Sequence, residues 1–259
     1  MGALTQAELL EGGRLLHLSL NAPKGNVLSQ AMMGEISSAL GEHREHRPLR
    51  LVLLTAEGSH FSFGASVEEH RREQAPAMLR TFHSLVRNLS AYPVPIAALV
   101  QGQCLGGAFE LVLACHLVFA TPSASFACPE VKLGVFPPVL AAIGPLRLGH
   151  PVSERMLLTG ESLDAESARR IGFVARLMNA NSARSEVMAW FREVIAPLSA
   201  FAIRQATKVS RHSSGILHAL GTSLSDAERQ YLDEVLTSRD GNEGIAAFLE
   251  RRKPAWEDL

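Results

Sequence analysis

The chain has 259 residues, of which 47% are hydrophobic and 20% are charged, a balance that predicts a soluble globular protein of one large domain, with or without an appendage. The formal net charge of −1 provides no excess of lysine and arginine for phosphates, which argues against binding to nucleic acid or to a membrane surface. The three cysteines lack metal-ligand spacing, and the sequence shows neither a signal-peptide pattern nor an apolar run of membrane-spanning length. We therefore expect a cytoplasmic protein without a disulfide framework.

The first elements alternate between strands and helices. Residues 14–20 (RLLHLSL) predict a strand, which a Pro-Lys-Gly-Asn loop at 23–26 follows. Ser29 is placed to cap a helix that reaches about residue 47, and residues 50–55 (RLVLLT) predict a short buried strand. This order of strand, loop, helix and strand favours a layered α/β fold.

A glycine-centred turn comes next, within FSFGASVEE at residues 61–69. Gly64 and Ala65 are small, so a backbone N–H at this turn could approach a ligand closely, although an ordinary turn is the alternative interpretation. A helix over 77–91 and a strand over 96–100 are expected to follow.

The stretch QGQCLGGAFELVLAC, residues 101–115, combines a glycine pair with an apolar run interrupted by one carboxylate. A helix with this composition has no polar face, so we expect it to be buried on all sides. Its first turn leaves N–H groups unpaired at the positive end of the helix dipole, where Gly107 could stabilise a developing negative charge. Glu110 is either a buried acid or base for catalysis, or a first-turn acid that complements the dipole.

Two short strands are expected at 117–120 and 125–127, and the second delivers Pro129 and Glu130 to its end. Residues at strand ends often belong to functional sites, but a solvent-exposed loop acid is the alternative for Glu130. From residue 153 onward the sequence predicts helices over 153–159, 164–171, 182–196, 201–210, 216–236 and 243–252. Pro197 suggests a boundary between residues 1–197 and a helical region at 198–259.

The motifs FSFGAS, QGQCLGGAFE, PEVKLG and AFLERRKPAW occur in the order and at the separations found in the crotonase (enoyl-CoA hydratase/isomerase) superfamily, which the chain resembles over nearly its whole length. The resemblance implies an α/β fold built as a spiral of ββα units in two nearly perpendicular sheets. It also implies a C-terminal helical region that forms a trimer, often paired into a hexamer, and an acyl-CoA substrate. The sequence has no H-E-x-x-H motif and no P-loop lysine, so we expect neither a metal nor a separate cofactor.

Carried over by position, the resemblance makes Ala65 and Gly107 the two amides that hold the thioester oxygen, and Glu110 and Glu130 the catalytic carboxylates. Two carboxylates that share one site cannot both ionise cheaply, so one proton should remain on the pair near neutral pH. Further positions that the resemblance assigns to substrate or CoA binding are Lys24, Ser66, Phe136, Phe248 and Arg251.

Within the superfamily, FSFGASVEEH, GQCLGGAFELVLAC and LGVF are most similar to the cyclohexa-1,5-diene-1-carbonyl-CoA hydratases, in which a serine such as Ser66 follows the oxyanion alanine. Where common hydratases have a glycine-rich loop after the second acid, this chain has the more apolar PPVLAAIGPLRL at 137–148, which we expect to be a loop that reshapes the acyl pocket.

Several alternatives stay open from sequence. They are a hydratase or dehydratase of linear or branched enoyl-CoA or of carrier-protein thioesters, a double-bond isomerase, and a non-catalytic CoA-binding protein. Retention of both acids argues against the last of these.

Overall fold

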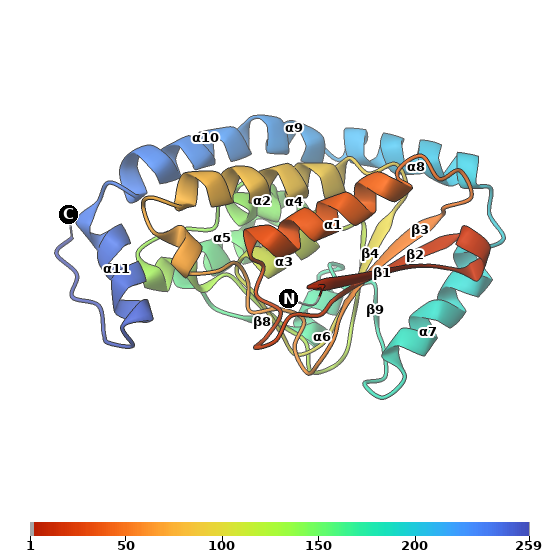
Figure 1. The fold of residues 1–259 in the computed structure, drawn as a ribbon, viewed down its shortest axis with the longest axis horizontal. Coiled ribbons are helices and arrows are strands. Elements are labelled where there is room, and N and C mark those ends of the chain that lie inside the picture. The colour runs from red at the N-terminus through yellow and green to blue at the C-terminus, as the bar shows by residue number, and fades with distance from the viewer. Residues whose placement is uncertain (1–2, 259) are drawn as a thin grey trace.

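Two β-sheets organise the chain, which a computed structural model describes from residue 3 to residue 258 (Figure 1). The larger sheet has the order β1-β2-β3-β4-β6-β9, formed by Thr5–Leu10, Leu15–Leu20, Leu51–Ala56, Ile96–Val100, Leu117–Ala120 and Arg176–Leu177. β1 is antiparallel to β2, and the following pairs are parallel. The smaller sheet joins β5 (Gln103–Leu105), β7 (Ser125–Ala127) and β8 (Leu163–Asp164).

The larger sheet is buried on both faces because its strands are apolar at consecutive positions. In β3, Val52 belongs to the core beneath helices α1, α2 and α3, while Leu53 belongs to a second core beneath α7. The helices before the C-terminal region are α1 (Gln30–His43), α2 (Ala75–Ser90), α3 (Gly107–Ala114), α4 (Pro138–Leu148), α5 (His150–Thr159), α6 (Ala165–Arg170) and α7 (Ala183–Trp190). As predicted, Ser29 caps α1, its hydroxyl accepting from the Met32 amide at 3.3 Å.

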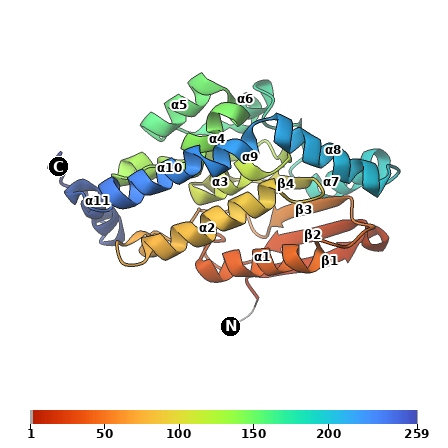
Figure 2. The ribbon, with the colours of Figure 1, turned by 90° about the horizontal axis from the view of Figure 1, so that it is seen from above.

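The C-terminal helices fold back onto the rest of the chain. They are α8 (Ala200–Ser213), α9 (Ile216–Gly221), α10 (Ser223–Gln230) and α11 (Arg239–Leu249), and Figure 2 shows α8, α9 and α10 in a row that crosses the molecule beside α2 and α4. α9 and α10 contact α4, and Leu220, Leu224 and Tyr231 are part of the main core. The boundary at residues 197 and 198 stays a prediction.

The structure confirms the strands predicted at 96–100, 117–120 and 125–127 and corrects other predictions. Residues 138–148 form the helix α4 and not the predicted loop. A helix can begin at Pro138 because the N–H groups of a first helical turn have no partner within the helix, so the missing proline N–H costs nothing there. The helix predicted over 216–236 is divided into α9, α10 and a π-helical turn at Tyr231–Val235, and further short helices lie at Glu11–Gly13, Glu68–His70, Pro129–Leu133 and Phe191–Ile195. β1, β5, β8 and β9 were missed. β5, β8 and β9 have only two or three residues each, and β1 is exposed along most of its length.

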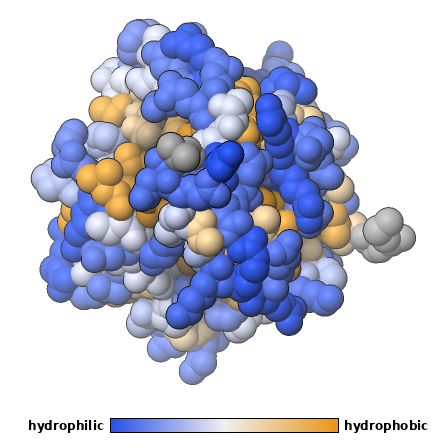
Figure 3. All heavy atoms as spheres, turned by 90° about the vertical axis from the view of Figure 1, so that its left-hand side faces the viewer, coloured by the Kyte–Doolittle hydropathy of each residue, from blue (hydrophilic) through white to orange (hydrophobic). Residues whose placement is uncertain are grey.

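Within residues 3–258, no helix combines the length and apolar character needed to cross a bilayer. Figure 3 views the end of the molecule that carries α11, where hydrophilic side chains cover most of the face and smaller hydrophobic areas lie between them. The hydrophobic residue Phe248 of α11 is 54% exposed.

Candidate active site

The start of α3 is shaped by two glycines, as the sequence predicted. Gly106 has φ 52° and ψ −130°, a conformation that side-chain-bearing residues rarely adopt, and Gly107 is the first helical residue. A Cβ atom on Gly106 would lie 2.7 Å from Oε1 of Glu130. Glycine at this position therefore allows the Glu130 carboxyl group to lie against the backbone that precedes the helix.

The turn around Ala65 lies beside the start of α3. A Cβ atom built on Gly107 would be 3.3 Å from the Ala65 Cβ and 3.4 Å from the Ala65 nitrogen, so the two backbones are in contact. The neighbouring backbone is held by a bridge between Ser62 and Cys104. In the hydrogen bonds formed by residues 3–258, neither the Ala65 nor the Gly107 amide is a donor outside the regular elements. These two N–H groups are thus available to a ligand at the positive end of α3.

Glu110 is 3% exposed and is fixed by the helix that the sequence did not predict. Its Oε1 accepts from the amides of Val139 at 2.7 Å and Leu140 at 2.9 Å, in the first turn of α4. Burial raises the pKa of Glu110 to about 7, and the two amides oppose this rise because they stabilise the ionised form.

Glu130 follows β7 in the short helix Pro129–Leu133, and its environment differs from that of Glu110. Among the described residues no group forms a hydrogen bond with its buried Oε2 atom. Burial, followed by the nearby charge of Glu110, raises the pKa of Glu130 to about 8. The pair therefore retains a proton near neutral pH, and the two amides that donate to Glu110 favour Glu110 as the ionised partner.

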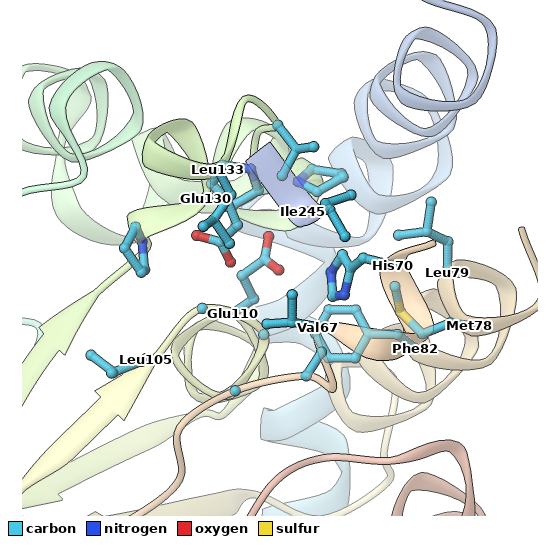
Figure 4. A pocket seen from close by; sticks show the side chains of 18 of the residues that line it. Val67, His70, Met78, Leu79, Phe82, Leu105, Glu110, Glu130, Leu133 and Ile245 are labelled. Atoms are coloured by element: carbon cyan, nitrogen blue, oxygen red, sulfur yellow. The ribbon is translucent and has the colours of Figure 1, made fainter. Parts of the chain in front are cut away.

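Both carboxyl groups face a cavity of about 520 Å³, a size suited to a small-molecule ligand (Figure 4). The polar side chains in its wall are those of His70, Glu110, Lys132, Glu130 and Tyr231. The rest of the wall consists of backbone at the glycines and of apolar residues, which are Phe63, Ala65, Val67, Met78, Leu79, Phe82, Leu105, Pro129, Leu133, Val135, Pro137, Pro138, Ile245 and Phe248. The site is therefore an apolar chamber with two acids and two free amides at one end.

The structure brings Ala65, Gly107, Glu110, Glu130 and Phe248 to this one cavity. Other residues singled out from the sequence lie outside its wall. The exposed Lys24 lies in a neighbouring hollow that shares Phe63 with the cavity, and Arg251 is exposed just after α11.

Ser66 follows Ala65 directly, and its carbonyl oxygen accepts from His70 Nδ1 at 2.8 Å. The Phe136 ring packs against Tyr231 with 5.5 Å between ring centroids. The binding roles of Lys24, Ser66, Phe136 and Arg251 stay predictions.

Sequence reasoning missed three polar residues of the cavity wall, which are His70, Lys132 and Tyr231. Lys132 lies two residues after Glu130, within the PEVKLG motif, but was not singled out. His70 ends the short helix Glu68–His70, four residues after Ser66, so its position close to the turn at Ala65 was a usable signal. Tyr231 comes from the far C-terminal region, and no local pattern connects it with Glu110 or Glu130.

The chain matches a family model described as enoyl-CoA hydratase/isomerase over residues 11–259. The cyclohexa-1,5-dienecarbonyl-CoA hydratase of Thauera aromatica is 43% identical over 246 residues, which cover 95% of this chain and 94% of that protein. The mitochondrial enoyl-CoA hydratase domain-containing protein 3 of Homo sapiens is 31% identical, with 97% and 83% covered. A crystal structure of an enoyl-CoA hydratase from Mycobacterium avium subsp. paratuberculosis superposes with a TM-score of 0.85 at 26% identity and covers 99% of both chains.

Proposed function

The chain belongs to the enoyl-CoA hydratase/isomerase family of enzymes, and from this premise we propose that it adds water to an α,β-unsaturated CoA thioester whose acyl group is a cyclic diene. One observation carries the proposed reaction: two buried carboxyl groups and two free amides meet in one apolar cavity. The cyclic acyl group is supported by 43% identity to the hydratase of Thauera aromatica and by a cavity of about 520 Å³ with an apolar wall.

The thioester oxygen is the group that we assign to the amides of Ala65 and Gly107. As water attacks the double bond, negative charge moves onto this oxygen, where two fixed N–H donors and the dipole of α3 stabilise it. The loss of one such donor typically raises the barrier by about 3 kcal/mol.

The two acids have different roles in this proposal. Glu110, which two amides hold in its ionised form, accepts a proton from water as the oxygen bonds to the substrate carbon. Glu130, with its higher pKa, donates a proton to a carbon of the resulting enolate. Glu110 gains one proton from water and Glu130 gives one proton to the substrate. The pair therefore holds a single proton before and after the reaction.

The CoA portion would leave the cavity where Phe248 is exposed, and we assign Phe248, Lys24 and Arg251 to its binding, with Ser66 and Phe136 supporting the acyl end. We also propose a homotrimer or a pair of trimers. Phe201 and Val209, which are 73% and 63% exposed on α8, support such an assembly because large apolar side chains on a helix are commonly covered by a partner.

The test is incubation of the purified protein with crotonyl-CoA, 3-methylglutaconyl-CoA and cyclohexa-1,5-diene-1-carbonyl-CoA, followed by mass spectrometry. The proposal predicts a gain of one water, fastest with the cyclic diene. Faster hydration of a linear or branched substrate would contradict the proposed acyl group. A rearranged product of unchanged mass, or CoA binding without any product, would contradict hydration itself.

A further inference from the structure

Tyr231 is a buried residue of the cavity wall whose hydroxyl group has no hydrogen-bond partner within residues 3–258. The residue is 1% exposed, and its ring is held by an edge contact with Phe136. Its carbonyl oxygen accepts from the Leu236 amide in the π-helical turn Tyr231–Val235. Turns of this kind are frequently found at functional sites.

A second unpartnered polar atom, Oε2 of Glu130, belongs to the same cavity. The unpaired state costs less while Glu130 carries a proton than when it is ionised, and the carboxyl group must become an anion when it gives that proton to the substrate. A buried anion without a hydrogen-bond donor is strongly unfavourable. The reaction therefore requires a donor for Glu130 at that moment.

Most other donors at the cavity are already committed. The Val139 and Leu140 amides bind Glu110, and His70 donates through Nδ1 to the Ser66 carbonyl. Burial lowers the pKa of His70, so its ring is neutral and its other nitrogen is an acceptor.

Two further sources of N–H groups near the cavity are also excluded as donors to Glu130. The amides of Ala65 and Gly107 are assigned to the thioester oxygen in the proposed function, so they are not free for Glu130. Lys132 is exposed, so its ammonium group is solvated rather than buried. Tyr231 is the neutral, buried and uncommitted donor among the side chains in the described wall of the cavity.

We propose that Tyr231 is a positioning residue for Glu130, to which its hydroxyl donates a hydrogen bond once the carboxyl group is ionised. This inference rests on the proposed function, in which Glu130 cycles between its acid and its anion. The phenol itself stays protonated, because burial and the neighbouring acids raise the pKa of Tyr231 well above its usual range. It therefore remains a donor throughout the cycle.

The chain offers a matched control, since Tyr92 and Tyr231 are its two tyrosines. The Tyr92 hydroxyl donates to the Leu40 carbonyl oxygen at 2.9 Å and is buried away from the cavity. Tyr92→Phe removes a satisfied hydrogen bond and should lower the melting temperature. Tyr231→Phe removes an unpartnered hydroxyl and should leave the melting temperature equal or higher.

The deciding measurement is a ¹³C NMR titration of carboxyl-labelled glutamate, with the Glu130 signal assigned by its loss in Glu130→Gln. We expect Tyr231→Phe to raise the pKa of Glu130 by about one unit, since a donor to the ionised form is lost, and Tyr92→Phe to leave it unchanged. An unchanged Glu130 titration in Tyr231→Phe would overturn the proposal.

Turnover gives a second readout on whichever thioester the wild type hydrates. Tyr231→Phe should lower kcat roughly tenfold with KM within about twofold, as for the loss of an interaction made during proton transfer. Wild-type kcat in this variant would overturn the inference and leave the hydratase proposal intact. If the wild type hydrates none of the thioesters, the proposed function fails, and the NMR titration alone decides the role of Tyr231.

Discussion

The two ends of α3 both hold buried charged side chains, but they hold them differently. At the N-terminal end, Glu110 and Glu130 share one cavity, and burial raises the pKa of both carboxyl groups. At the C-terminal end, Arg147 donates to the Cys115 carbonyl oxygen at 3.0 Å and Arg211 donates to the Ala114 carbonyl oxygen at 2.7 Å. Burial lowers the pKa of Arg211 to about 10, which still leaves the guanidinium charged at neutral pH.

The C-terminal end of α3 is arranged for stability, and its N-terminal end is arranged for chemistry. Cations at a helix C-terminus complement the dipole and occupy carbonyl groups that would otherwise lack partners. At the other end, like charges are placed together and one carboxyl oxygen of Glu130 has no partner within residues 3–258. An arrangement that is unfavourable at rest is useful when a proton must be transferred.

The largest expected effect is on turnover at the N-terminal end. Glu110→Gln and Glu130→Gln should each lower kcat at least roughly a hundredfold, because each removes acid or base catalysis. Both variants should remain folded. In Glu110→Gln the amide oxygen can still accept from the Val139 and Leu140 amides, and Glu130→Gln breaks no hydrogen bond of Oε2, which has no partner within residues 3–258. Steady-state kinetics and circular dichroism check this, and near-wild-type hydration by either variant would exclude the two-carboxylate assignment.

A substitution at the C-terminal end of α3 should lower stability and leave turnover nearly unchanged. Arg211→Met leaves the buried Ala114 carbonyl oxygen without this donor and should lower the free energy of unfolding by about 2 kcal/mol. Turnover should stay within about threefold, because α3 separates Arg211 from the amides by roughly 12 Å.

Denaturant unfolding measures the change, with Arg229→Met as the control. Arg229 forms an exposed pair with Asp226, and its loss should change stability by less than about 0.5 kcal/mol. If Arg211→Met and Arg229→Met changed the free energy of unfolding equally, Arg211 would have no special stabilising role at the C-terminal end of α3.

The last expected effect is the pH dependence of stability. The folded pKa values of about 7 and about 8 lie above the ordinary value of 4.5 for glutamate, so the folded protein binds more protons than the unfolded chain between these limits. This stabilisation is present below pH 4.5 and is lost as the pH rises through the folded values. Between pH 5 and 8 the wild type should lose stability relative to the double glutamine variant by on the order of several kcal/mol, as measured by denaturant unfolding. Parallel curves would argue against raised pKa values.

The comparison also shows which features the sequence could predict. The N-terminal end of α3 was predictable because its signals are local: Gly106, Gly107 and Glu110 lie within five positions and precede a run of apolar residues. The strands predicted at 96–100 and 117–120 had equally local apolar patterns. The pairing of Glu110 with Glu130 came from a family resemblance rather than from any rule of spacing.

The partners of these groups were not predictable, because they depend on packing between distant segments. Val139, which binds Glu110, lies 29 residues further along the chain, in a proline-containing segment that favoured a loop. Arg211 reaches Ala114 across 97 residues. Tyr231 enters the cavity only because the C-terminal helices fold back over α4.

The most direct test of the shared proton is the pH profile of kcat/KM for hydration by the wild type and both glutamine variants. We predict a bell-shaped wild-type profile with an acidic limb near pH 7, from ionisation of Glu110, and an alkaline limb near pH 8, from ionisation of Glu130. The residual activity of Glu110→Gln should lose the acidic limb and that of Glu130→Gln the alkaline limb. If both limbs persist in both variants, the two carboxyl groups are not the acid and base of the reaction.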